Sequence, residues 1–438
     1  MLQPISPSLP EVHRSLDVPS RKGFWRKLLA FAGPGYLVAV GYMDPGNWAT
    51  DLAGGSKYNY SLLSVIFCSS LLAMFLQWLA LKLGIATGHD LAQACRLHYG
   101  KRASVPLWIA AEVGIAACDL AEVIGSAIAL NLLFHIPLLW GVLITTLDVL
   151  LLLLLQKKGF RYIEALVITL IGTIAICFGL EILFSKPQLF PILRGFVPTQ
   201  AVVTDPGMLF IAIGILGATV MPHNLYLHSS IVQTRRYPLD VIGKREAIRF
   251  ATIDSNIALS VALGINAAIL ILSAATFYRA GRNDIAEIQE AYKLLTPMLG
   301  VTGASTLFAV ALLAAGQNST LTGTMAGQVV MEGFIHLRIA PWLRRLVTRL
   351  LAVIPAIIVI AVAGDGATTR LLLLSQVILS MQLSFAVIPL VQFTGSKRIM
   401  GEFVNAAWVR VAGWGAALLI AGLNIWLLLL QFHHGSLP

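Results

Sequence analysis

Two short polar segments interrupt long apolar stretches of the chain, and each carries side chains that can bind a metal ion. The first, residues 41–47, contains Asp44 and Asn47, and the second, residues 217–224, contains Met221. A carboxylate and an amide oxygen are hard ligands that suit divalent cations. A thioether favours transition metals over Ca²⁺ and Mg²⁺. This combination predicts a site for Mn²⁺ or Fe²⁺.

Each segment also contains a proline, Pro45 in the first and Pro222 in the second. Proline removes a backbone hydrogen bond and clashes with the preceding helical turn, so both segments are expected to be unwound. Unwinding frees the carbonyl groups near Gly41 and Ala218 to act as further ligands. Each proline alone could be a simple kink, and Met221 alone could be a core filler. Two matched breaks with polar side chains favour the metal site, because non-helical backbone at membrane depth must line a cavity or be buried in protein.

Three acids in a third apolar stretch could carry protons. Glu112, Asp119 and Glu122 are spaced so that they share one face of a helix. Carboxylates within a membrane are costly and usually mark function, although a buried ion-pair cluster that only fixes helix packing is the alternative. With nearby basic groups, the expected proton pathway comprises Glu112, Asp119, Glu122, His223, Arg344 and Arg345.

The composition requires that membrane helices carry these side chains. Only 12% of the 438 residues are charged and 57% are hydrophobic, whereas a soluble protein has roughly 25% charged residues. Soluble enzymes and disordered chains are therefore excluded. A helix that spans a bilayer needs about 20 mostly apolar residues, and eleven such runs are expected at 28–56, 61–86, 104–133, 138–155, 162–184, 207–233, 250–277, 301–334, 342–363, 368–394 and 404–430.

The distribution of basic residues predicts the orientation of these runs. The chain has 31 lysines and arginines against 21 acids, and most of the basic residues fall in alternate loops, on the side of the N-terminal tail. Because cytoplasmic loops are enriched in Lys and Arg, we expect a cytoplasmic N-terminus and a C-terminus on the outer side. The basic excess therefore reflects topology rather than binding to nucleic acid, and no obligate protein partner is indicated.

The two breaks lie in corresponding positions of two blocks of five runs. Because five is odd, the second block must be inverted relative to the first. Paired interrupted helices in inverted halves are typical of secondary transporters with a site near the bilayer midplane. We therefore expect an all-α polytopic membrane protein with a 5+5 inverted repeat, in which helices 1 and 6 are unwound at the midplane. The expected divisions are a cytoplasmic tail at 1–27, one transmembrane domain at 28–430 (repeats 28–184 and 207–394, extra helix 404–430) and a tail at 431–438.

Three motifs carry a resemblance to a known family. Asp-Pro-Gly-Asn at 44–47, Met-Pro-His-Asn at 221–224 and Gly-Gln-Asn-Ser-Thr-Leu-Thr-Gly-Thr at 316–324 resemble signatures of the Nramp family of divalent metal transporters, especially its bacterial members. The resemblance implies a LeuT-like fold and import of Mn²⁺ and Fe²⁺ coupled to protons. Metal and protons would be transported substrates, with no cofactor and no enzymatic activity. By position, the implied metal-binding residues are Asp44, Asn47, Met221, Ala218, Gly41 and Gln376.

Two features indicate which branch of the family the sequence resembles. Met221 is retained, which argues against magnesium- or aluminium-specific branches. Eleven spans, rather than the twelve common in eukaryotic members, favour a bacterial inner-membrane protein.

The alternatives are a sodium-coupled amino-acid carrier on the same fold, an intramembrane aspartyl-type hydrolase and a passive channel. Asp44 and Met221 speak against the amino-acid carrier. The hydrolase would need a second acid on a facing helix, and no second acid motif beyond the third run is evident.

Overall fold

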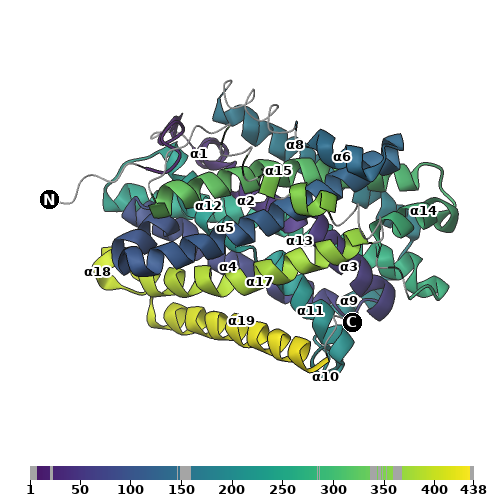
Figure 1. Cartoon of the computed structure of the whole chain (residues 1–438). Helices are drawn as coiled ribbons and strands as arrows, with labels where there is room; N and C mark the ends of the chain where they lie inside the picture. Colours follow the sequence, from purple (N-terminus) through teal and green to yellow (C-terminus); the bar gives the residue numbers. More distant parts are fainter. Residues whose placement is uncertain are drawn as a thin grey trace.

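The computed structural model is a bundle of long helices that lie side by side (Figure 1). It describes residues 7–19, 23–145, 147, 159–283, 285, 287–335, 343, 347, 349–351, 353–358 and 367–434. The helices of the first half are α1 (Phe24–Phe31), α2 (Pro34–Ala39), η1 (Val40–Met43), α3 (Pro45–Tyr58), α4 (Leu63–Thr87), α5 (Leu91–Phe134), α6 (Leu138–Thr145), α8 (Phe160–Ser185), α9 (Leu189–Gly195) and α10 (Ala201–Thr204). Those of the second half are α11 (Pro206–Thr219), α12 (Pro222–Ile231), η2 (Val232–Thr234), α13 (Val241–Thr276), η3 (Tyr278–Ala280), α14 (Ile288–Leu299), α15 (Ala304–Ile335), α17 (Ala367–Thr394), α18 (Lys397–Met400), η4 (Gly401–Phe403) and α19 (Ala407–His434).

Seven helical spans among the described residues are long and apolar enough to cross a membrane. They are Leu63–Thr87, Leu91–Phe134, Phe160–Ser185, Pro206–Thr234, Val241–Ala280, Leu374–Thr394 and Ala407–Trp426. The expected runs at 138–155 and 342–363 are only partly within the described residues. Their described parts, α6 and residues 353–358, are helical. Eleven spans are compatible with this architecture.

The first expected break is present between η1 and α3, and together with a separate joint at Gly33 it divides the first span into four pieces. Helices α1 and α2 are separated at Gly33, which has φ of 139°. After α2 the chain tightens into the 3₁₀ helix η1, and Asp44 is extended, with φ of −68° and ψ of 164°. Pro45 then starts α3, where its missing N–H is not needed because the first helical N–H groups have no partner within the helix.

The second break separates α11 from α12. Helix α11 ends at Thr219, and Met221 is extended, with φ of −80° and ψ of 123°. Pro222 occupies the first turn of α12. Both breaks therefore have the same local cause, because each proline starts a new helix after an extended residue.

The N-terminal segment packs against one end of the bundle. Strands β1 (Leu16–Asp17) and β2 (Arg235–Arg236) pair in parallel. Leu9 is 2% exposed, and its N–H donates to Glu332 Oε2 on α15 at 3.2 Å. We call residues 7–18 the N-terminal strap, because they contact both α15 and the strand that follows α12. The expected division at residue 27 stays a prediction.

Candidate functional site

The carboxylate of Asp44 is fixed at the start of α3. Its Oδ1 accepts hydrogen bonds from the backbone N–H of Asn47 at 2.8 Å and from Asn47 Nδ2 at 2.7 Å. An acid at this position stabilises a helix by pairing with its free N–H groups and with the positive end of its dipole. Asp44 Oδ2 has no hydrogen-bond partner among the described residues. One oxygen is thus held by the helix, and the other is available to a ligand.

Asn47 joins the two breaks. Its Nδ2 also donates to the carbonyl oxygen of Ala218 on α11 at 3.0 Å. Met221, three residues further along, is fully buried and packs with Cys118 and Leu379. The structure therefore brings together the first and second breaks, as the sequence predicts for a shared site.

Two glycines allow other polar side chains to reach the breaks. A Cβ atom on Gly46 would lie 1.7 Å from Gln376 Nε2, so only glycine admits Gln376 of α17 at this distance. A Cβ atom on Gly41 would lie 2.2 Å from Asn224 Nδ2. Asn224 is buried, and both polar atoms of its side chain lack a partner within the described chain. Asn224 was not predicted from the sequence, although its place beside Pro222 and His223 at the end of the second motif was a signal.

The site formed by these residues is enclosed. Of the six residues expected to bind the metal, Gly41 is buried, and the other five are at most 1% exposed: Asp44, Asn47, Ala218, Met221 and Gln376. No three His, Cys, Asp or Glu side chains gather as a metal cluster in the part of the chain that the structure describes. A single carboxylate with amide, carbonyl and thioether groups suits an ion that must be released again better than a permanently bound one.

Two of the three expected acids lie together on α5. Glu122 is fully buried, and its Oε1 accepts hydrogen bonds from Ser319 Oγ at 2.7 Å and from Cys118 Sγ at 3.4 Å. Asp119 is 4% exposed and also faces α15, where a Cβ atom on Gly323 would lie 3.0 Å from its Oδ1. The third acid, Glu112, is partly exposed and accepts a hydrogen bond from Trp108 at 3.0 Å. Glu112 therefore lies nearer the surface than the other two.

Cys118 connects the acids with the second break. Its Sγ lies 3.8 Å from Nε2 of His223, the residue after Pro222. The same thiol contacts Glu122 and packs against Met221. The expected metal site and the expected proton pathway are thus adjacent, with Cys118 between them. From the sequence alone, this cysteine would be interpreted as a small apolar filler.

The arginine beside the acids is Arg349. Its Nη1 lies 3.8 Å from Glu122 Oε2, and its Nη2 donates to the carbonyl oxygen of Thr145 at 3.2 Å. Arg349 was not predicted from the sequence, which pointed to Arg344 and Arg345 instead. Both of those lie outside the described residues, so their role stays a prediction.

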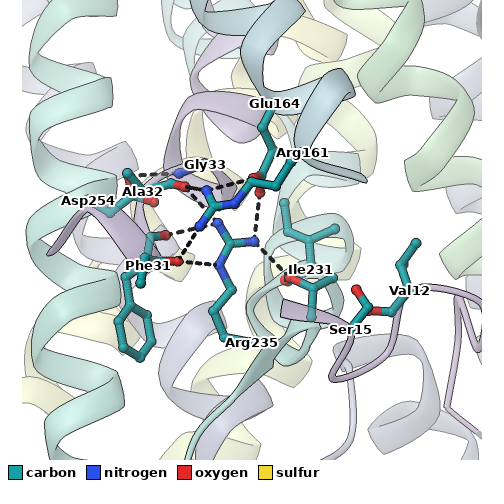
Figure 2. Close-up of polar contacts among 12 residues, drawn as sticks. Val12, Ser15, Phe31, Ala32, Gly33, Arg161, Glu164, Ile231, Arg235 and Asp254 are labelled. Atoms are coloured by element: carbon teal, nitrogen blue, oxygen red, sulfur yellow. Dashed lines mark hydrogen bonds and ion pairs between the residues drawn. The ribbon is translucent and has the colours of Figure 1, made fainter. Parts of the chain in front are cut away.

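A second polar cluster lies away from the metal site, at the joint between α1 and α2 (Figure 2). This Arg235 cluster consists of Arg161, Glu164, Arg235 and Asp254. Arg235 Nη1 donates to Glu164 Oε1 at 2.6 Å, and Arg161 Nη1 donates to Glu164 Oε2 at 3.0 Å. The side chains of Arg235 and Glu164 are 0% and 2% exposed. They form a buried ion pair, in which each charge depends on the other in place of water.

The Arg235 cluster holds the backbone on both sides of the joint. Arg235 Nη2 donates to the carbonyl oxygen of Ala32 at 2.7 Å, and Asp254 Oδ1 accepts from the N–H of Gly33 at 3.2 Å. Gly33 has a positive φ, and a Cβ atom there would lie 2.2 Å from Glu164 Oε1. The joint therefore requires glycine, and the cluster fixes α1 against the bundle. The Arg235 cluster was not predicted from the sequence.

Comparison with known proteins decides the family. The family model for Nramp, natural resistance-associated macrophage protein-like, matches residues 35–430. The chain belongs to the Nramp family. The divalent metal cation transporter MntH of Nostoc sp. is 63% identical, over 97% of this chain and 96% of its own length. MntH of Listeria innocua is 62% identical, over 97% and 94%. The expectation of a transporter rather than an enzyme is confirmed.

Solved structures confirm the fold. A manganese transporter of Eremococcus coleocola, in complex with an aromatic bis-isothiourea compound, is 46% identical with a TM-score of 0.90, covering 95% of this chain and 90% of that chain. Mhp1 in an inward-facing conformation is 15% identical with a TM-score of 0.56, covering 98% and 94%. The likeness to Mhp1 concerns the fold alone. This Nramp chain is a multi-pass, all-α membrane protein of LeuT-like architecture, as the sequence predicts.

Proposed function

We propose that the chain is a proton-coupled symporter that imports Mn²⁺ and Fe²⁺ across a bacterial inner membrane by alternating access. One observation carries the proposal: two candidate metal ligands lie at the two helix breaks. They are the Oδ2 atom of Asp44, which has no hydrogen-bond partner among the described residues, and the sulfur of Met221. An unpartnered buried carboxylate oxygen is costly, and a bound cation removes that cost. The relatives named as divalent metal cation or manganese transporters support this cargo.

Each ligand has a distinct part in the proposed site. Asp44 supplies the negative charge, and Asn47 and the Ala218 and Gly41 carbonyls supply neutral oxygens. Met221 supplies a soft sulfur, which discriminates against Ca²⁺ and Mg²⁺. Gln376, brought close by Gly46, supplies a further amide oxygen when α17 approaches. The metal is cargo in this proposal, and no cofactor is required.

The proposed proton route runs along α5 and α15. Asp119 and Glu122 would together take up one proton as metal binds, and Arg349 would compensate the negative charge that remains on the pair. Cys118 and His223 lie between these acids and the metal site. Glu112, Arg344 and Arg345 are proposed to continue the route toward the cytoplasm. The basic loops support a cytoplasmic N-terminus and an outer C-terminus.

Uptake of Mn²⁺ into proteoliposomes tests the metal site. With acid outside, the wild type should take up Mn²⁺, and Asp44→Ala should lose uptake because no charge remains to offset dehydration of the ion. Asp17→Asn is the matched control, since the Asp17 carboxylate is exposed and pairs with Arg236 on the surface. Normal uptake by Asp44→Ala would show that the site assignment is wrong. Sodium-driven amino-acid uptake instead would favour the alternative carrier.

A further inference from the structure

An open cleft lies between α1 and the start of α13, apart from the metal site. It has a volume of about 560 Å³ and is lined by Phe24, Lys27, Ile242, Arg245, Glu246, Arg249 and Phe250. The cleft is at the end of the bundle that carries the N-terminal strap, because α13 begins shortly after β2. None of its lining residues belongs to the metal site, the acids of α5 or the Arg235 cluster.

The charge of the cleft is positive. Lys27 forms an ion pair with Glu246, which neutralises the only acid of the lining set. Arg245 lies 3.5 Å from Glu402, with both side chains more than half exposed, so that pair is weak. Arg249 is exposed, with no hydrogen bond or ion pair to any described residue. Its guanidinium is therefore available to an anion, with the charge of Arg245 nearby.

The same cleft carries an apolar surface. The rings of Phe24 and Phe250 are in contact, with centroids 5.4 Å apart. Beside them, Trp25 and Ile242 are 73% and 77% exposed. Large exposed apolar side chains next to Lys and Arg at the end of a membrane helix are typical of the membrane interface. A soluble anion would leave these side chains in water, whereas a lipid would cover them.

We propose that this cleft binds an anionic glycerophospholipid of the cytoplasmic leaflet. The lipid phosphate lies against Arg249 and Arg245, and its acyl chains lie along Phe24, Trp25 and Ile242. The choice of leaflet rests on the proposed orientation, and the cytoplasmic leaflet is the one with a negative surface potential.

A lipid in this position bridges α1 and the start of α13. Helix α1 is joined to α2 through Gly33, and at its other end it contacts α13 through Phe24 and Lys27. A bridging lipid adds contacts between α1 and α13, so it stabilises the arrangement in which α1 is packed on the bundle.

Native mass spectrometry of the full-length protein in detergent tests the proposal without any transported metal. The protein is titrated with palmitoyl-oleoyl phosphatidylglycerol or with the zwitterionic phosphatidylcholine of the same chains. The wild type should retain phosphatidylglycerol about fivefold better, the factor expected for one cation at an anionic surface. Arg249→Gln should remove this preference, and it breaks no hydrogen bond or ion pair among the described residues. Arg102→Gln, an exposed arginine of α5, is the matched control and should keep it.

Two further arms make the outcome decisive. Arg249→Lys keeps the charge and should restore retention of phosphatidylglycerol. Excess glycerol phosphate should leave the lipid bound, because it lacks the acyl chains. Equal retention of the two lipids by the wild type, or an unchanged preference in Arg249→Gln, would overturn the proposal. Displacement by glycerol phosphate would show a site for soluble phosphate instead. These readouts are independent of Mn²⁺ uptake, so failure here leaves the proposed function untouched.

Discussion

At the scale of single residues, Met221 is expected to set which cations the site accepts. It is buried in an extended turn between two helices, where its sulfur is the only soft group of the proposed ligand set. Met221→Ala should lower Mn²⁺ affinity about tenfold, or roughly 1.4 kcal/mol, and should admit Ca²⁺ or Mg²⁺. Competition of each ion with Mn²⁺ uptake measures this change. Met325→Ala, which truncates another buried methionine on α15, is the control. An unchanged selectivity profile would contradict the role of the sulfur.

Single residues also show where sequence reasoning succeeds and fails. Asp44 could be named because an acid is so expensive in a membrane that few are present. Arg349 could not, because several arginines lie near the start of the ninth apolar run and the sequence does not show which one faces Glu122. Cys118 gave no signal, since a cysteine in a helix is usually a small apolar filler. Its importance comes from its neighbours on α12, which only the packing of α5 against α12 supplies.

At the scale of elements, the joint between α1 and α2 is expected to act as a gate on the cytoplasmic side. Arg235→Gln removes the buried partner of Glu164 and leaves it only the partly exposed Arg161. Breaking a buried ion pair costs about 3–5 kcal/mol where no partner remains, so a cost up to that size is expected. The closed position of α1 should therefore become less populated. A cysteine at Ala39, which is buried here, should then react faster with a membrane-impermeant thiol reagent applied from the cytoplasmic side.

The neighbouring arginine provides the control for that experiment. Arg236 is more than half exposed and pairs with Asp17 on the surface, so Arg236→Gln should leave the reaction rate of the cysteine unchanged. The native cysteines are replaced in both variants so that only the new thiol reports. If Arg235→Gln and Arg236→Gln react equally fast, the Arg235 cluster does not hold the gate.

The elements themselves were predictable to different degrees. Pro45 and Pro222 predicted both breaks, because proline acts on its own backbone and the preceding turn wherever it occurs. The joint at Gly33 was not predicted, although Gly33-Pro34-Gly35 was a signal for it. The contacts that Gly33 makes with α8 and α13 come only from the packing of these helices. The β1–β2 pair is two residues long on each strand, too short to leave a periodic pattern in the sequence.

At the scale of the whole molecule, the bilayer makes the architecture readable. A helix satisfies its own backbone groups in lipid, so long apolar runs predict helices, and the matched breaks predicted the repeat. Enclosure of the site is a different matter. It arises because several helices meet around the breaks, namely α3, α5, α11, α12 and α17. How closely these helices approach one another cannot be predicted from the sequence.

Proton coupling at the enclosed site predicts that the protein can concentrate Mn²⁺ against its own gradient. If protons drive uptake, Mn²⁺ should accumulate in proteoliposomes above its outer concentration when the outside is acid, and a channel could not do this. Glu122→Gln keeps the hydrogen-bonding groups near Ser319 but cannot ionise, so it should bind Mn²⁺ and yet lose the acceleration by the pH gradient. Glu181→Gln, which alters another fully buried acid on α8, should keep it. Calorimetric Mn²⁺ binding alongside uptake separates the two effects. Gradient-independent uptake by the wild type would refute proton coupling, whereas gradient-driven uptake by Glu122→Gln would move the coupling to Asp119 or Asp44.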